Sequence, residues 1–332
     1  MNQFSVVSGE TIVELLEGHE QDVIDRVREA YLAHGVGGSI NPDSYFLHFP
    51  DKPDSRIIAL PAYLGGDVDT VGIKWISSFP KNTASGRPRA SAVLVLNDYE
   101  TGYPYALLES AGISAARTAA SAALAARTLH GDAPQSVGVV GGGVIARTIC
   151  RYLHGAGVAL KEVCCHDLDE ASAGALSRHL TESFGTRADI ATLAEALGCD
   201  LVVLATTALA PYIPATQSFQ AGQVVLNVSL RDLAPELLLS ANNVLDDVEH
   251  CMKADTSPHL AEQLTGNRDF VTGTLAEVIS GAVALDAALP TVFSPFGLGV
   301  LDLAVGRYLY VRAAEQGRTI EIPGFFGETR RW

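Results

Sequence analysis

The sequence predicts an α/β protein in which a doubly wound parallel sheet is combined with a β-rich α+β part. Three observations support this prediction. Strand-like segments crowd together before residue 110, strands alternate with helices after residue 136, and a glycine-rich turn joins the first of these later strands to a helix. The alternation of strands and helices is typical of βαβ units.

The first 110 residues are predicted to form one helix followed by several strands. Apolar residues recur at helical spacing over residues 11–35. Turns rich in glycine, proline and aspartate separate the segments that follow. The predicted strands are residues 44–49, 56–64, 70–79, 90–98 and 104–110. This part is therefore a β-rich unit with an N-terminal helix.

The pattern changes at residue 112. Residues 112–129 are rich in small side chains, which predicts a helix that packs closely against a neighbour. Strands and helices then alternate, as expected for a parallel sheet. The predicted strands are 136–143, 161–167, 200–207, 222–229 and 242–248, with helices that include 144–157 and 168–184.

Residues 299–317 form a last long helix, which we expect to pack back on another part of the chain. We therefore expect two domains. Residues 1–128, completed by residues 300–332, would form a substrate-binding and dimerisation domain. Residues 129–299 would form the domain with the parallel sheet.

The composition excludes several classes of protein. The chain has 332 residues and a formal net charge of -15, so it is a poor candidate for binding a nucleic-acid backbone. Its five cysteines form no C-x-x-C or metal-like pattern, which indicates reduced thiols, no metal site and a cytoplasmic location. The start of the sequence lacks the pattern of a signal peptide, and no apolar run approaches the length of a membrane span.

The glycine-rich turn has the spacing of a dinucleotide-binding motif. Gly141, Gly143 and Ala146 form G-x-G-x-x-A between an apolar strand and a helix. The first glycine permits the tight turn, the second lets a pyrophosphate approach the backbone, and the alanine lets helix and strand pack closely. Val144 and Ile145 begin the helix, whose free N–H groups favour the anion. This context predicts a Rossmann-type fold rather than a glycine turn without a ligand.

The next predicted strand ends in Asp167, at about the offset where an acidic side chain binds the ribose hydroxyls. The residues after it include no arginine or lysine to pair with a 2′-phosphate. We therefore expect the cofactor to be NAD rather than NADP. Asp169 is the alternative ribose acid, although it lies past the strand end.

Polar side chains also follow two later strands. Thr206 and Thr207 end one strand, and Ser229 and Asp232 follow another. Ligands of open α/β sheets bind at this edge, so Thr206, Ser229 and Asp232 are candidates for the site. A helix cap or a turn is the alternative explanation for each of them.

Three cationic side chains interrupt apolar segments in the first part of the chain. They are Arg56, Lys74 and Arg117. A buried cation without a partner is costly, so each either extends to water or meets an anion. Arg117 falls in the first turn of its helix, where the helix dipole disfavours a cation. These positions are consistent with an NAD-dependent enzyme that acts on a small carboxylate.

Several segments resemble the ornithine cyclodeaminase/mu-crystallin family. They are "GIKWISS", "TGYPYALLES", "ISAARTAA", "VVGGGVIA", "LNVSLRD" and "FSPFGLGV". Within the family, the sequences of these segments are most similar to the branch that makes L-2,3-diaminopropionate for siderophores and peptide antibiotics. Together the segments span nearly the whole chain.

The resemblance implies an activity and roles for particular residues. The reaction would be the NAD-dependent oxidation of N-((2S)-2-amino-2-carboxyethyl)-L-glutamate, with hydrolysis of the imine to 2-oxoglutarate and L-2,3-diaminopropionate. Arg56 and Arg117 match the family's substrate-carboxylate arginines, Lys74 its active-site lysine, and Asp232 its proton carrier. The resemblance also implies a homodimer, and a cysteine-synthase-like partner enzyme that supplies the substrate.

The chemistry explains why a lysine is needed. Hydride leaves the carbon only after the secondary ammonium group has lost a proton. Neighbouring arginines would disfavour the charged form of Lys74 and lower its pKa toward the useful range. Two alternatives stay open at this point. One is an ornithine cyclodeaminase or another amino-acid dehydrogenase or ketimine reductase of the family, and the other is a non-catalytic binder of nucleotides or small ligands.

Overall fold

The computed structural model describes residues 4–131 and 133–327. The chain divides into two compact units. The first unit contains the chain up to Arg117 together with the chain from Leu298 onward, and the second contains Thr118–Gly297. Within the described residues, no helix combines the length and the apolar character needed to cross a membrane.

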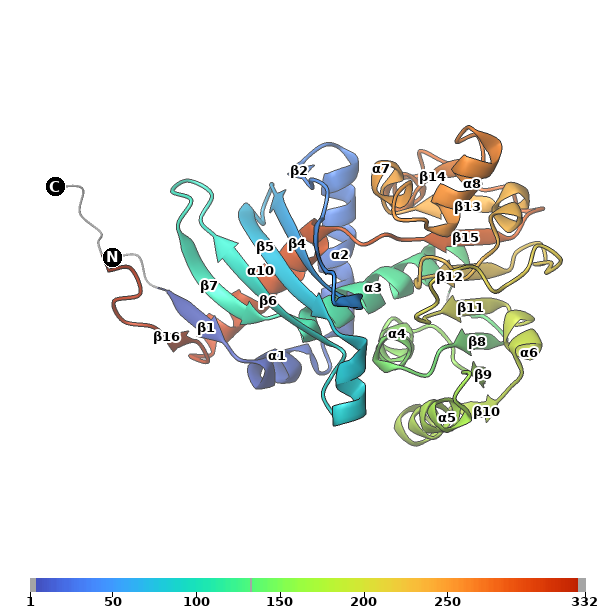
Figure 1. Cartoon of the computed structure of the whole chain (residues 1–332), viewed down its shortest axis with the longest axis horizontal. Helices are drawn as coiled ribbons and strands as arrows, with labels where there is room; N and C mark the ends of the chain where they lie inside the picture. The colour runs from blue at the N-terminus through green and yellow to red at the C-terminus, as the bar shows by residue number, and fades with distance from the viewer. Residues whose placement is uncertain (1–3, 132, 328–332) are drawn as a thin grey trace. The chain divides into compact units, whose positions relative to one another are not determined.

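The first unit is built on a mixed sheet (Figure 1). The strand order is β16-β1-β7-β6-β5-β4-β2, and β3 pairs with β4. The β1–β7 pair is parallel and the other pairs are antiparallel. The strands are β1 (Ser5–Val7), β2 (Ser39–Ile40), β3 (Tyr45–Phe49), β4 (Lys52–Leu64), β5 (Thr70–Ser78), β6 (Ala90–Asn97), β7 (Pro104–Glu109) and β16 (Ile320–Glu321). The last strand shows how the end of the chain completes this unit.

Helices cover one face of this sheet. They are α1 (Gly9–Leu16), α2 (Glu20–Gly35) and α10 (Gly299–Glu315), and the 3₁₀ helix η1 (Pro80–Ser85) precedes β6. The single helix expected over residues 11–35 is in fact two, because Gly18 turns the chain with a φ of 72°. α10 packs on β4, β5 and β6. The approach is close, since a Cβ on Gly306 would lie 2.2 Å from Cδ2 of Leu94.

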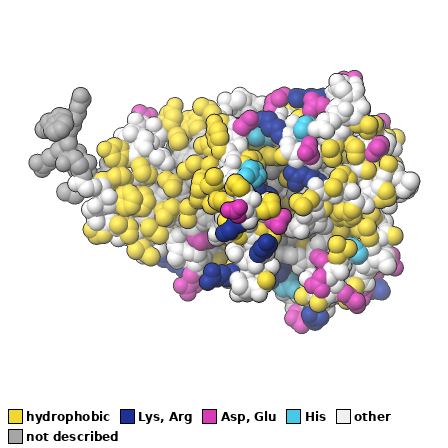
Figure 2. Space-filling model, in the orientation of Figure 1, with side chains coloured by type: hydrophobic (Ala, Val, Ile, Leu, Met, Phe, Trp, Pro, Cys, Tyr) yellow, Lys and Arg dark blue, Asp and Glu magenta, His cyan; other side chains and the backbone are white. Residues whose placement is uncertain are grey.

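The two faces of the sheet differ sharply. Successive side chains of a strand point to opposite faces, so Gly72 and Lys74 share the face under α10 and are buried. Trp75 points the other way and is 43% exposed. Tyr45 and Leu47 of β3 share that open face by their pairing register. Figure 2 shows hydrophobic side chains gathered over the strands of this unit.

The second unit contains a parallel sheet with the order β10-β9-β8-β11-β12-β15-β13-β14. Its strands are β8 (Val137–Val140), β9 (Glu162–His166), β10 (Arg187–Ile190), β11 (Leu201–Leu204), β12 (Val224–Asn227), β13 (Asn242–Leu245), β14 (Val271–Thr274) and β15 (Thr291–Ser294). The order reverses direction between β8 and β11, which is the switch point of a doubly wound fold. The predicted Rossmann-type sheet is therefore confirmed.

Helices connect these strands. They are α4 (Val144–Gly155), α5 (Glu170–Phe184), α6 (Leu193–Leu197), α7 (Val248–Cys251), α8 (Ser257–Thr265) and α9 (Leu275–Ser280), with the 3₁₀ helix η2 (Pro235–Ser240). α3 (Ala111–Leu129) links the two units, and the division between them falls inside it rather than at residue 128. Its small side chains are largely buried, in agreement with close packing.

Candidate active site

The glycine turn after β8 has a geometry that requires its glycines. Gly141 has a φ of 102°, and a Cβ there would lie 2.4 Å from the carbonyl oxygen of Ala205. Gly143 is exposed at the start of α4, and nothing lies within 4 Å of the position of a Cβ on it. Ala146 is fully buried against the sheet. The turn therefore leaves open space in front of the first N–H groups of α4, beside Val144 and Ile145.

Asp167 follows β9 and faces this turn. Its Oδ2 atom accepts a 2.6 Å hydrogen bond from the amide of Gly142. Asp169, the alternative ribose acid, instead caps α5 by accepting hydrogen bonds from the amide and hydroxyl of Ser172. Leu168 between them is fully exposed. Of the two acids, only Asp167 is directed at the turn.

Thr206 and Asp232 meet at the switch point. Thr206 follows β11, the neighbour of β8, and its hydroxyl lies 3.0 and 2.9 Å from the two carboxylate oxygens of Asp232. The phenol of Tyr212 donates to the same carboxylate at 3.0 Å. Burial raises the pKa of Asp232, while the hydroxyls of Ser229, Thr206 and Tyr212 act in the opposite direction. Tyr212 could not be predicted, since one tyrosine in a polar loop matches no motif.

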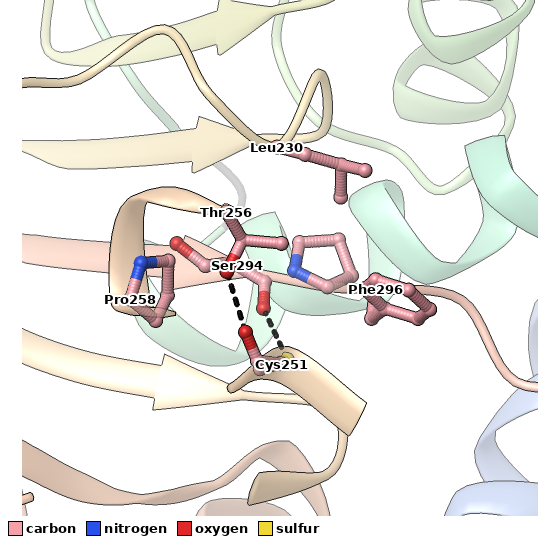
Figure 3. A pocket seen from close by; sticks show the side chains of 7 residues that line it. Leu230, Cys251, Thr256, Pro258, Ser294 and Phe296 are labelled. Atoms are coloured by element: carbon pink, nitrogen blue, oxygen red, sulfur yellow. Dashed lines mark hydrogen bonds between the residues drawn. The ribbon is translucent and has the colours of Figure 1, made fainter. Parts of the chain in front are cut away.

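The loop between Ser229 and Asp232 is strained. Leu230 has a φ of 76°, which is rare for a residue with a branched side chain. A small hollow lies beside it at the carboxyl ends of β12, β13 and β15 (Figure 3). It is lined by Leu230, Cys251, Thr256, Pro258, Ser294, Pro295 and Phe296. In it the thiol of Cys251 donates to the carbonyl oxygen of Ser294 at 3.2 Å, so the hollow is a packed part of the fold.

A buried charge cluster lies between β5, α3 and α10 in the first unit. Nζ of Lys74 is 2.7 Å from Oδ2 of Asp302, and the two side chains are 2% and 0% exposed. Nε of Arg117 is 3.4 Å from Oδ1 of the same aspartate. Lys74 also donates to Oγ of Ser114 at 3.3 Å. Lys74 therefore does not extend to water, and one carboxylate serves two cations.

The surroundings of Lys74 shift its proton equilibrium. Burial lowers the pKa of Lys74 from the usual 10.5 to about 8. The charge of Asp302 acts in the opposite direction, and that of Arg117 adds to the lowering. A lysine with a pKa near 8 can accept or donate a proton close to neutral pH.

Arg56 occupies a different position on the same face. Its Cα lies opposite Ser78 in the pairing of β4 with β5, and Lys74 pairs with Leu60. From the sequence we expect Arg56 to lie close to Lys74 and Arg117. The structure instead gathers Lys74 and Arg117 around Asp302 and sets Arg56 four residues further along the strands.

Asp302 is the functional candidate that the sequence analysis missed. It is an acid inside the apolar run "GVLDLAVG", and that interruption is the signal that could have identified it. The described residues contain no group of three or more His, Cys, Asp or Glu side chains that could hold a metal ion.

Together these features define a class: a two-unit α/β protein with a Rossmann-type sheet and a buried lysine–aspartate–arginine cluster on a second sheet. The chain belongs to the ornithine cyclodeaminase/mu-crystallin family, whose sequence pattern matches residues 5–317.

Named relatives match most of the chain. The chain is 28% identical to an N-((2S)-2-amino-2-carboxyethyl)-L-glutamate dehydrogenase of Staphylococcus aureus, over 92% of this chain and 94% of the relative. It is 28% identical to a Delta(1)-pyrroline-2-carboxylate reductase of Bacillus thuringiensis, over 84% and 88% of the two chains. Among solved structures, an archaeal alanine dehydrogenase dimer with bound NAD superposes with a TM-score of 0.86, at 26% identity, over 97% of this chain and 100% of that one.

Proposed function

We propose that this protein is an NAD-dependent amino-acid dehydrogenase that acts on a secondary amine. Its proposed substrate is N-((2S)-2-amino-2-carboxyethyl)-L-glutamate, and its proposed products are L-2,3-diaminopropionate and 2-oxoglutarate. The observation that carries the proposal is the buried Lys74, which has a pKa of about 8 and lies beside a guanidinium group. The similarity to the S. aureus dehydrogenase supports the choice of substrate.

The residues at the glycine turn fit NAD. The open space at Gly143 and the free N–H groups of α4 suit a pyrophosphate, and the carboxylate of Asp167 suits the ribose hydroxyls. The acids that follow it, Asp169 and Glu170, would repel a 2′-phosphate. When bound, NAD would accept the hydride from the substrate carbon.

Lys74 and the arginine beside it perform the remaining steps in this proposal. Arg117 binds a substrate carboxylate and so orients the α-hydrogen. Neutral Lys74 takes the proton from the secondary ammonium group, which frees the nitrogen lone pair. Loss of hydride leaves an iminium ion, and water adds to its carbon. The C–N bond then breaks to give the ketone and the protonated amine, and one proton is released overall. Asp232, through its contact with Tyr212, carries the second proton.

The test combines the purified protein with NAD and each substrate in turn. The proposal predicts NADH together with equal amounts of 2-oxoglutarate and L-2,3-diaminopropionate from the conjugate. An ornithine cyclodeaminase would convert ornithine without net NADH, because the hydride returns to the intermediate. Tight NAD binding with no turnover of any amine would instead indicate a non-catalytic binder.

A second candidate is a reaction with a smaller amino acid or a cyclic imine. The similarity to the pyrroline-2-carboxylate reductase and to the archaeal alanine dehydrogenase favours it. Both reactions also take place at a carbon that carries a nitrogen and a carboxylate. The same panel separates them, since alanine or proline would then give NADH faster than the conjugate.

The protein is further proposed to act as a homodimer through the open face of the first unit's sheet. Apolar side chains are unusually exposed there, including Tyr45 at 70%, Leu47 at 47% and Trp75 at 43%. The solved relative that is a dimer supports this assembly. The location is proposed to be the cytoplasm, where NAD is available.

The substrate itself implies an earlier enzyme. Its C–N bond joins the glutamate nitrogen to a carbon derived from a serine unit, so a β-replacement reaction must form it. We propose a cysteine-synthase-like enzyme that uses O-phosphoserine and glutamate, with the product directed to a siderophore or a peptide antibiotic.

A further inference from the structure

A second cationic group lies on the face of the sheet that carries Lys74. Ser78 is four residues along β5 from Lys74, and side chains two residues apart share a face. Arg56 is directly opposite Ser78 on β4. Four residues of a strand span about 13 Å, so this group is separate from the Lys74 cluster but lies on the same face.

Arg89 joins this group from the turn before β6. Its NH1 donates to Oγ of Ser78 at 3.0 Å. Packing around the guanidinium group, and secondly the charge of Arg56, lower the pKa of Arg89. The two guanidinium groups are therefore close enough to repel each other.

Within the described residues, no carboxylate balances these charges. Neither Arg56 nor Arg89 forms an ion pair there, and the buried Nε of Arg56 donates no hydrogen bond. The Lys74 cluster differs, because Asp302 lies between its two cations. A buried donor without an acceptor, such as Nε of Arg56, is unfavourable, and the nearby charge of Arg89 adds repulsion to that cost. An anion from solution would relieve both costs.

The surface between the two groups is apolar. Ile58 and Ile76 pair across β4 and β5, midway between the Lys74 and Ser78 positions, and both are partly exposed. Ala92 of β6 lies next to Ile76 and adds little bulk. This strip suits the methylene groups of a ligand that has a carboxylate at each end.

We propose that Arg89, held by Ser78 and facing Arg56, is a specificity residue that binds a second carboxylate of the substrate. The first carboxylate is the one bound at Arg117 beside Lys74. The inference rests on the proposed function and extends it: the site selects amines with two or more carboxylates over monocarboxylic amino acids. A guanidinium group suits this task, because it binds a carboxylate through two parallel hydrogen bonds.

The test uses Arg89→Gln, with Arg87→Gln as the matched control. Arg87 lies two residues earlier in the same turn and is exposed, as Arg89 is, but of the two only Arg89 donates to Ser78. The loss of Arg87 therefore removes the same charge and leaves the Ser78 contact in place. The NAD-loaded proteins are titrated by calorimetry with glutarate, a dicarboxylate, and with butyrate, a monocarboxylate. KM and kcat for the conjugate are measured in parallel.

We expect Arg89→Gln to weaken glutarate binding and to raise KM for the conjugate by about 10- to 100-fold. Butyrate binding and kcat should change less than about threefold, and Arg87→Gln should behave as the wild type. Arg89→Lys, which keeps the charge but loses the fork of donors, should recover part of the loss and guards against misfolding of the first variant.

Equal effects of Arg89→Gln on glutarate and butyrate, or no effect on either, would overturn the inference. So would a wild-type protein that binds glutarate no better than butyrate. The titrations need no turnover, so they test Arg89 even if the conjugate yields no NADH. A conjugate that yields no NADH would refute the proposed function and leave the inference about Arg89 to the titrations.

Discussion

Lys74 shows how a single buried charge can be set up for proton transfer. Burial alone would favour the neutral amine, and Asp302 at 2.7 Å restores much of the charged form. The balance places the pKa of Lys74 at about 8. Because the neutral amine accepts the substrate proton in the proposed mechanism, kcat/KM should rise with pH up to about 8 and level off above it.

Removal of the Asp302 charge should move this profile in a known direction. Asp302 raises the pKa of Lys74, so Asp302→Asn should lower it and shift the acidic limb of kcat/KM to lower pH. The variant should keep a larger share of its plateau activity at pH 6.5 than the wild type does. Initial rates of NADH formation across pH measure both.

Asp22→Asn is the control for that experiment. It removes the same charge from a carboxylate that also contacts α10, by accepting from Tyr308, but it is exposed. Its pH profile should match the wild type. An unchanged profile in Asp302→Asn would mean that Asp302 does not set the proton affinity of Lys74.

The extent to which individual site residues could be predicted depends on how local their contacts are. Gly141, Gly143 and Asp167 lie within one βαβ unit, so a short motif identifies them. Asp302 is 228 residues from Lys74, and only the fold brings the two together. Asp232 follows a strand end and was a candidate, but its burial under Thr206 and Tyr212 has no counterpart in the sequence pattern.

At the scale of elements, the turn between β8 and α4 contains one glycine that the fold requires, Gly141, and one that is proposed to bind NAD, Gly143. Gly141→Ala would place a methyl group 2.4 Å from a backbone oxygen at a positive φ. It should destabilise the fold by about 2 kcal/mol or more. Gly143 has an ordinary φ of -80°, and the methyl group of Gly143→Ala would meet no other atom, so the variant should fold as stably as the wild type.

NAD binding should distinguish the two variants further. A methyl group on residue 143 would occupy the space in front of the helix N-terminus, so Gly143→Ala should weaken NAD binding about tenfold or more. Thermal unfolding and NAD titration measure the two effects. A stable Gly141→Ala variant, or normal NAD affinity in Gly143→Ala, would contradict this assignment.

Most long elements could be predicted because their own residues carry the pattern. The expected strands from residue 56 to residue 110 correspond to β4, β5, β6 and β7. The missed strands β1, β2, β10, β14, β15 and β16 have two to four residues each. They lack the continuous apolar run that identifies the equally short β11, and pairing partners fix them instead. β15, late in the chain, even inserts between β12 and β13.

At the scale of the whole molecule, the first unit presents one sheet face to its own helices and leaves the other open. A dimer would cover that open face. Trp75→Glu should therefore shift the protein from dimer to monomer in analytical ultracentrifugation, because it buries a charge in an apolar interface. Val36→Glu is the control, since Val36 is 86% exposed at the end of α2.

A dimer that persists unchanged in Trp75→Glu would show that this face is not the interface. A wild-type protein that is monomeric would refute the proposed dimer.

We propose above all that Lys74 moves a proton during NAD-dependent cleavage of the amino-acid conjugate. Lys74→Met tests it most directly, because methionine keeps the length and apolar volume of the buried side chain while Arg117 can still pair with Asp302. NADH formation from the conjugate is followed by absorbance, with NAD affinity measured alongside. We expect normal NAD binding and a loss of kcat of about 100-fold or more. NADH production near the wild-type rate in Lys74→Met would contradict it.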